Sequence, residues 1–130
     1  MARNHDAWLA EMARRARMPF DWRRNDCARY AAACVKAQTG RNALHGLRWA
    51  SKAGAARVLL RLGGMEAAVD ARLTRIAPAM AMRGDVAGVF DPDFGVSLMI
   101  VEGATLVGPG ETGEKRLPRA AMIMAWSAEA

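Results

Sequence analysis

The sequence contains few cysteines and no long apolar run. Two cysteines among 130 residues, with no Cys-x-x-Cys pair, cannot build the disulfide framework of a small secreted domain. No apolar run approaches the ~18 residues that cross a bilayer, which predicts that the protein has no membrane span. The arginine-rich N-terminal segment lacks the apolar core of an export signal. We therefore expect synthesis in the bacterial cytoplasm without a signal peptide.

Histidine is also scarce, and this limits the chemistry that the chain can perform. The two histidines are His5 and His45, and none follows position 45. No cluster of His, Cys and Asp has the spacing of metal ligands, so we expect neither a metal nor a cofactor. The glycine-rich segment 108–113 lacks the Gly-Lys-Ser/Thr ending of a phosphate-binding loop and is expected to form a hairpin or loop tip.

The remaining composition is typical of one folded domain. The chain is 52% hydrophobic and 25% charged, which excludes a disordered or fibrous protein. A chain of this length supports one core and leaves no room for a second domain. We predict a single domain over residues 1–130, with a helical part at 4–73 and a sheet part at 75–127.

The positive charge is concentrated in the first half. Residues 1–61 carry thirteen Lys or Arg against four Asp or Glu, a net of +9, whereas residues 62–130 carry a net of −3. A basic half can bind an acidic protein surface or nucleic acid, or it can simply be a solvated helical face. No zinc finger or helix-turn-helix signature supports nucleic acid, which we do not expect as a partner. Arg14, Arg15, Arg23 and Arg24 are candidate contacts to a protein partner.

Capping residues and apolar spacing predict helices in the first half. One helix is expected from Asn4 or Asp6 to Pro19. In a second, Asp26 is the N-cap, apolar residues recur every three or four positions, and Gly40 ends the helix.

The chain changes character after about residue 75. Two further helices, at 51–63 and 65–73, are followed by short β-branched runs bounded by turn residues. This order predicts an α+β domain in which N-terminal helices pack on an antiparallel sheet formed by the C-terminal half. The expected strands are 84–90, 96–101, 105–107 and 121–126.

Cys27 is the residue with the most distinctive chemistry. It directly follows the expected N-cap Asp26, so its sulfur lies near the positive end of a helix dipole, which lowers a thiol pKa. Neighbouring arginines strengthen this effect, and the Asp26 charge opposes it unless that charge is used for capping. Alternatively, Cys27 is a small apolar residue on the buried helix face together with Cys34.

The segment Phe20–Ala28, which reads Phe-Asp-Trp-Arg-Arg-Asn-Asp-Cys-Ala, resembles the nucleophile region of the NlpC-like branch of papain-like cysteine peptidases. Downstream, Arg83–Val86 resembles the Gly-Asp start of a strand in that family, and Gly95–Gly103 resembles its His-Val-Gly-Ile-Tyr strand. The order and spacing fit over residues 18–126. The resemblance implies a papain-like, NlpC-type fold with Cys27 at the nucleophile position.

A small phage and prophage family of the same ancestry is more similar still. Its Asn-Asp-Cys, Thr-Gly and Gly-Asp motifs correspond to Asn25–Cys27, Thr39–Gly40 and Gly84–Asp85. This resemblance implies a role in a phage-type particle. Asp85 at the equivalent position is interpreted as structural, capping a turn or pairing with an arginine.

The departures from the peptidase pattern concern the catalytic base. A cysteine peptidase needs a base beside the thiol, and the family's histidine position corresponds here to Gly95. The Gly-Gly of the loop before the nucleophile is replaced by Arg23 and Arg24. His45 is a candidate substitute base, although a helix about 20 Å long separates it from Cys27; His5 is another that only tertiary packing could bring close. Trp22, Asp26 and Gly95 would line the cleft.

Two functions are therefore carried forward. The first is a non-catalytic tail-tip or assembly component of a phage, prophage or gene-transfer-agent particle, a pseudoenzyme whose partners are other tail proteins. The second is an active cysteine hydrolase, a peptidoglycan endopeptidase or amidase, with Cys27 as nucleophile. In the second case peptidoglycan is the substrate, and His45 or another base must reach the sulfur.

Overall fold

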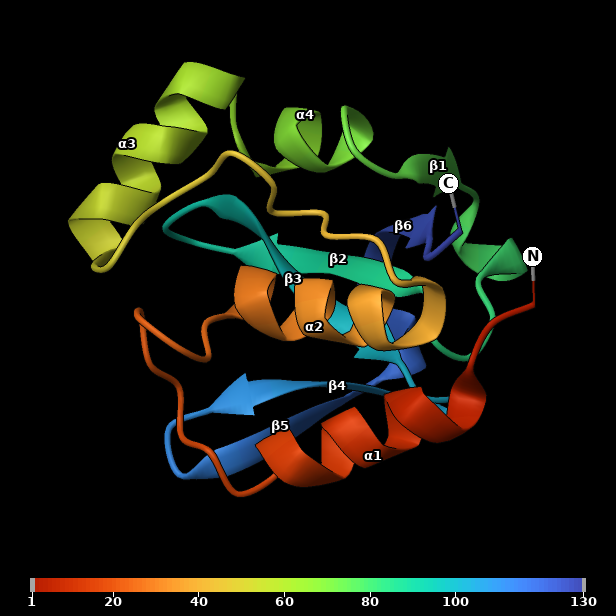
Figure 1. Ribbon diagram of the computed structural model, residues 1–130. Helices are drawn as coiled ribbons and strands as arrows, with labels where there is room; N and C mark the ends of the chain where they lie inside the picture. The colour runs from red at the N-terminus through yellow and green to blue at the C-terminus, as the bar shows by residue number, and fades with distance from the viewer. Residues whose placement is uncertain (1, 130) are drawn as a thin grey trace.

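The computed structural model describes residues 2–129, which form helices first and then a sheet. Two short 3-10 turns, η1 (Pro78–Met80) and η2 (Arg119–Ala121), lie in the connections between strands of the C-terminal half. The predicted α+β order is confirmed, with helices in the N-terminal half and an antiparallel sheet in the C-terminal half (Figure 1). The helices are α1 (His5–Arg15), α2 (Cys27–Thr39), α3 (Lys52–Leu62) and α4 (Met65–Asp70). The strands are β1 (Thr74–Ile76), β2 (Val86–Asp91), β3 (Gly95–Val101), β4 (Thr105–Gly110), β5 (Gly113–Pro118) and β6 (Met122–Ser127).

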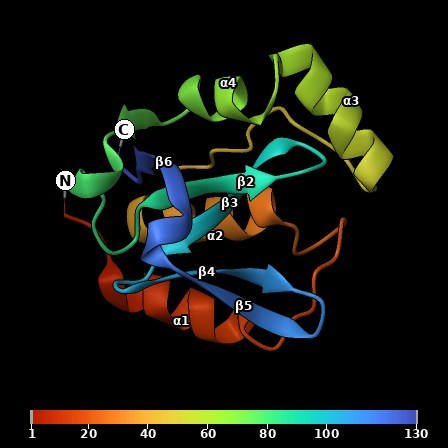
Figure 2. The same cartoon turned by 180° about the vertical axis from the view of Figure 1, so that it is seen from behind.

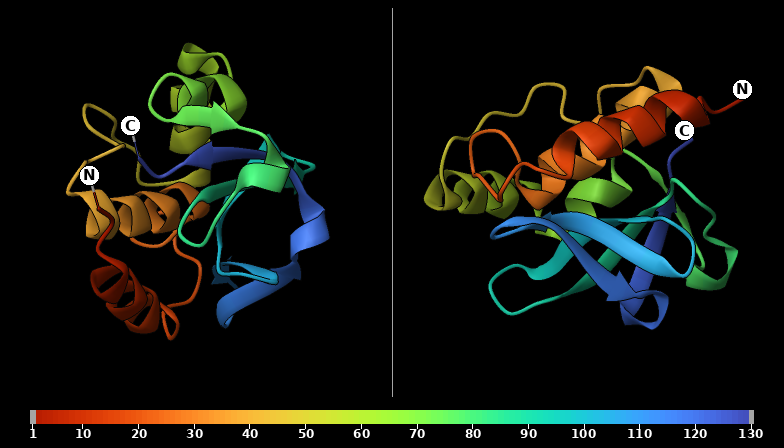
Figure 3. Two further views of the ribbon diagram at one scale, coloured as in Figure 1. Left: turned by 90° about the vertical axis from the view of Figure 1, so that its right-hand side faces the viewer. Right: turned by 90° about the horizontal axis from the view of Figure 1, so that it is seen from below.

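All neighbouring strands of the sheet are antiparallel. The strand order is β1-β6-β2-β3-β4-β5, so β6 returns to pair with β2 and the edges are β1 and β5. Seen from behind, the sheet lies in front of α1 and α2 (Figure 2). Figure 3 shows that the sheet is curved rather than flat. Helices α1 and α2 therefore cover one face of the sheet, and the sheet curves around its other face.

Side chains alternate between the two faces of the sheet and build a core on each. Along β3, Val96, Leu98 and Ile100 belong to the core beneath α1 and α2, while Met99 and Val101 belong to the core on the opposite face. This period of two is the pattern expected of a strand buried on both faces. The largest fully buried side chains of the helix-side core are Trp8, Tyr30, Val35, Val86, Ile100, Val107 and Trp126.

Several predicted boundaries need correction. The first helix ends at Arg15, before the expected Pro19, and the fourth ends at Asp70 rather than 73. Segment 108–113 is the tip of a β4–β5 hairpin, which confirms the hairpin interpretation. Strands β1 and β5 were not predicted; β5 carries mostly charged, exposed residues, as edge strands often do, and therefore lacks an apolar pattern.

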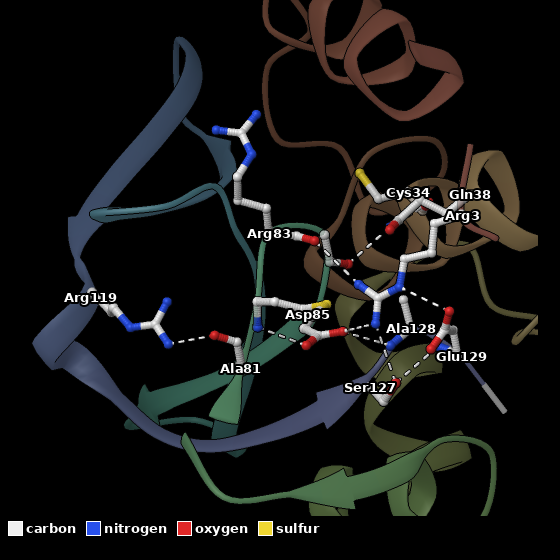
Figure 4. Close-up of polar contacts among 12 residues, drawn as sticks. Arg3, Cys34, Gln38, Ala81, Arg83, Asp85, Arg119, Ser127, Ala128 and Glu129 are labelled. Atoms are coloured by element: carbon white, nitrogen blue, oxygen red, sulfur yellow. Dashed lines mark hydrogen bonds and ion pairs between the residues drawn. The ribbon is translucent and has the colours of Figure 1, made fainter. Parts of the chain in front are cut away.

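Asp85 joins three distant parts of the chain, as Figure 4 shows. Its side chain is almost completely buried. Oδ1 accepts from Arg3 Nη2 at 2.7 Å and from the Ala128 N–H at 3.0 Å, and Oδ2 accepts from the Met82 N–H at 2.9 Å. The prediction that Asp85 caps a turn or pairs with an arginine is confirmed in both parts. This carboxylate holds the N-terminal segment against the end of β6.

Gly84, immediately before Asp85, approaches α2 closely. The buried Gln38 side chain donates from Nε2 to the carbonyl oxygens of Gly84, at 2.9 Å, and Cys34, at 3.1 Å. Gly84 has φ of +95°, and a Cβ at this position would overlap Gln38 Oε1. Glycine is needed here both for its backbone conformation and for its lack of a side chain.

A side chain at position 84 is therefore expected to lower the stability of the fold by more than the strain of its left-handed backbone conformation alone. We predict that Gly84→Ala lowers the free energy of unfolding by about 3 kcal/mol, because left-handed strain adds to the displacement of Gln38. Gly95→Ala is the matched control: Gly95 also has positive φ, +78°, but open space surrounds its missing Cβ. The control should lose only about 1 kcal/mol in urea unfolding. Equal losses would show that the contact with Gln38 contributes nothing.

Candidate functional site

Helix α2 begins where the sequence predicts, because Asp26 caps it. Asp26 has extended backbone angles, and its Oδ1 accepts from the Arg29 N–H at 2.8 Å. At the other end Gly40 takes the left-handed conformation with φ of +80°. Both ends follow the usual chemistry of helix caps. Cys27 is thereby the first residue of α2.

The second oxygen of Asp26 fixes the loop that follows α2. Asp26 Oδ2 accepts from Arg29 Nη1 at 2.5 Å and from the Trp49 indole Nε1 at 2.7 Å. The Arg29 guanidinium lies 4.2 Å from the centre of the Trp49 ring and donates to the carbonyl oxygens of Trp22 and Trp49. The segment between α2 and α3, which runs back along α2 in Figure 1, is held at the start of α2 by these contacts. Both oxygens of Asp26 thus have hydrogen-bond donors within the fold.

The Cys27 thiol is held in its neutral form. Although part of the residue remains accessible, protein atoms surround the sulfur densely, and this burial raises the pKa of Cys27 to about 11. The N–H groups of Leu98 and Ala28 lower the pKa, and the nearby charges of Asp26 and Asp91 raise it further. The expectation that the helix N-terminus lowers this pKa is wrong, because loss of solvation outweighs the dipole.

The part of β3 near this thiol presents apolar side chains to the helices. Val96 and Leu98 are the side chains of this part of β3 on the helix side of the sheet. Gly95, at the peptidase histidine position, is exposed at the start of β3. His5 and His45 are also exposed, and within residues 2–129 neither donates to or accepts from Cys27. The role of His45 as a base for Cys27 stays a prediction.

A cavity of about 90 Å³ opens beside Cys27, between α2, α3, α4 and the segment 43–49. Its lining is almost entirely apolar. Trp22 and Asp26, both predicted cleft residues, contribute to this lining, and Gly95 does not. Trp22 packs edge-on against Phe94, with ring centres 5.9 Å apart. The space beside Cys27 is therefore apolar.

Trp49 and Arg29 are the site residues that the sequence analysis missed. The three-residue spacing of Asp26 and Arg29 on one helix could have indicated their pairing. Trp49, in contrast, lies twenty-three positions from Asp26, and no local pattern connects the two.

The four candidate arginines differ in their surroundings. Arg14 and Arg15 donate to Glu11 at 2.7 and 2.6 Å, and Arg15 is mostly buried. The side chains of Arg23 and Arg24 are exposed and, within residues 2–129, make no hydrogen bond or ion pair. Arg23 and Arg24 are thus available to a partner, whereas Arg15 is part of the fold.

Comparison with known families matches nearly the whole chain. Residues 2–128 match the family described as "Domain of unknown function (DUF6950)". The chain belongs to this family. No curated protein and no solved structure matches the chain significantly. Within residues 2–129 of this family member, no helix has the length and hydropathy of a membrane span, and no cluster of three or more potential metal ligands occurs.

The contacts of Asp26 predict a measurable loss of stability. Asp26→Asn removes the charge that pairs with the partly buried Arg29, so we expect the free energy of unfolding to fall by about 2 kcal/mol. Asp21→Asn serves as the control, because Asp21 is exposed and the amide oxygen can still accept from the Arg23 N–H. That variant should change stability by less than about 0.5 kcal/mol. If both variants lose the same amount, Asp26 is only an ordinary cap.

Proposed function

We propose that this chain is a non-catalytic tail-tip or assembly component of a phage, prophage or gene-transfer-agent particle. In this proposal it is built on a degenerate NlpC-like, papain-type fold. The observation that carries the proposal is the state of Cys27: the residue is partly buried against the apolar core, its pKa is raised to about 11, and within residues 2–129 no histidine is hydrogen-bonded to it. In this proposal the peptidase-like architecture is retained without the chemistry that a nucleophile needs.

The missing chemistry favours this proposal over the hydrolase. Thiol attack requires a thiolate, and the leaving amine requires a proton from a nearby acid. Near Cys27, the Asp26 carboxylate is occupied by Arg29 and Trp49, and Leu98 of β3 is apolar. Neither Asp26, whose carboxylate is already paired, nor the apolar Leu98 meets these requirements.

The motifs shared with the phage and prophage family have structural roles in this chain. The buried Asn25 donates from Nδ2 to the carbonyl oxygens of Met18 and Pro19 and accepts from Arg15. Thr39 Oγ1 donates to the Val35 carbonyl oxygen at the end of α2. With the Gly84–Asp85 contacts already described, these roles explain why such motifs would be kept in a protein that does not catalyse a reaction.

The exposed arginines supply a surface for a neighbouring subunit. Arg17, Arg23 and Arg24 lie between α1 and α2, and their side chains make no ion pair within residues 2–129. Charges of one sign on an exposed surface favour association with an acidic partner and orient the encounter. We place the contact to an adjacent tail protein on this surface.

Incubation with peptidoglycan separates the two functions. Purified wild-type protein and Cys27→Ala should both release no soluble muropeptides from isolated sacculi, as measured by chromatography. Release by the wild type that is lost in Cys27→Ala would overturn the non-catalytic proposal and establish the hydrolase.

Particle assembly tests the structural role itself. In the strain that encodes the chain, we expect Cys27→Ala to leave particle yield unchanged. The double charge reversal Arg23→Glu and Arg24→Glu should reduce incorporation into particles at least tenfold, measured by mass spectrometry. Arg57→Glu with Arg61→Glu, the same change on exposed residues of α3, is the control. Absence of the wild-type chain from particles, together with normal assembly without it, would contradict the proposal.

A further inference from the structure

A second cavity, which we call the α3 hollow, opens beside α3 at the edge of the molecule (Figure 1). It lies between the segment 48–51 and α3 and has a volume of about 520 Å³. Pockets that bind ligands in proteins commonly have volumes of about 300–1,000 Å³. Most of the residues that line the hollow are exposed, so a partner reaches it from solvent without rearrangement of the fold: Arg48, Ala50, Ser51, Arg57, Leu60 and Arg61.

The charged residues that line the α3 hollow are all arginines. In the part of the chain that the structure describes, their side chains make no hydrogen bond or ion pair, and no acidic residue shares the lining. Asp93 and Glu66, which lie near the two ends of α3, are already paired with Lys52 and Arg75. The hollow therefore presents three unpaired positive charges, those of Arg48, Arg57 and Arg61.

Two of these arginines repel each other along α3. Arg57 and Arg61 are four positions apart, so their side chains lie on one face of the helix. Like charges at this spacing destabilise a helix, and α3 contains no Asp or Glu that would offset the repulsion. An acidic group bound between the two guanidinium groups would replace repulsion with attraction.

Apolar side chains share the α3 hollow with the arginines. Trp49, Val58 and Leu60 line it, and Leu60 is 82% exposed. Tryptophan and arginine are among the residue types that contribute most to binding between proteins. The phosphates of a nucleic acid would pair with the arginines and leave Leu60 uncovered. A peptide that carries both acidic and apolar side chains would engage both kinds of residue.

We propose that the α3 hollow binds an acidic peptide segment of another protein, with carboxylates on its arginines and an apolar side chain against Leu60 and Trp49. Charge complementarity determines the choice of an acidic segment, because a guanidinium pairs most strongly with an anionic oxygen. The site goes beyond the tail proposal and requires no particle. The contact to a tail protein is placed on the arginines between α1 and α2, so we expect charge changes on α3 to leave incorporation into particles unchanged.

The first test uses the purified chain and fluorescently labelled peptides of about twelve residues, followed by anisotropy. A peptide of Glu-Glu-Leu repeats should bind at least tenfold more tightly at low salt than the same peptide with Gln in place of Glu, and salt should reduce the difference. Replacing its Leu by Ser should weaken binding about threefold, because Leu60 and Trp49 lose their partner.

Three outcomes of this peptide titration would overturn the proposal. They are no binding of the Glu-Glu-Leu peptide, equal affinity for its Gln version, and tighter binding of a single-stranded DNA with the same number of charges. The last result would identify phosphate rather than carboxylate as the group that the hollow recognises.

A pair of double variants tests the position of the site. Arg57→Gln with Arg61→Gln should weaken binding of the Glu-Glu-Leu peptide at least tenfold without lowering the melting temperature, because the repulsion along α3 disappears. Lys36→Gln with Lys115→Gln is the matched control: both lysines are exposed, neither lines the hollow, and the same charge is removed. The control should keep the affinity within about twofold. Equal losses in the two double variants would show that the peptide responds to overall charge, which contradicts the assignment.

Discussion

The carboxylate of Asp26 is the contact on which the rest of this site depends. One oxygen satisfies a free N–H at the start of α2, and the other accepts from Arg29 and from the Trp49 indole. The loop after α2 is thereby brought back over its first turn, where it forms one wall of the cavity beside Cys27. The same contacts pair the negative charge that stands next to the thiol with Arg29. A residue that could have assisted catalysis instead maintains the shape of the site.

Burial decides the chemistry of Cys27. A helix N-terminus favours a nearby anion by about 0.3–1 kcal/mol in exposed positions and up to about 2 kcal/mol where it is partly buried. The rise in the Cys27 pKa from 9.0 to about 11 corresponds to roughly 3 kcal/mol in favour of the thiol. Desolvation therefore exceeds what the dipole supplies, and Leu98 offers no compensating side chain. Under these conditions Cys27 is part of the lining of an apolar cavity.

Local capping chemistry made much of the fold predictable, whereas the contacts between distant segments could not be predicted. Asp26 and Gly40 delimit α2 through interactions within a few residues, so the sequence pattern alone locates the helix. Strand β5 was missed because its exposed edge position allows charged residues that hide the strand pattern. The Trp49–Asp26 bond and the meeting of Arg41 with Arg72 join residues more than twenty positions apart. Such contacts between distant segments became visible only in three dimensions.

The pH dependence of Cys27 alkylation by iodoacetamide tests the central claim most directly, with peptide-resolved mass spectrometry separating Cys27 from Cys34. A pKa of about 11, against 9.0 for an ordinary thiol, leaves roughly one thiolate in a thousand at pH 8 instead of about one in ten. The account predicts that Cys27 reacts about a hundredfold more slowly than a free cysteine at pH 8, with a rate that keeps rising beyond pH 9. A rate that reaches its plateau below about pH 8 would show an activated thiolate and contradict the account.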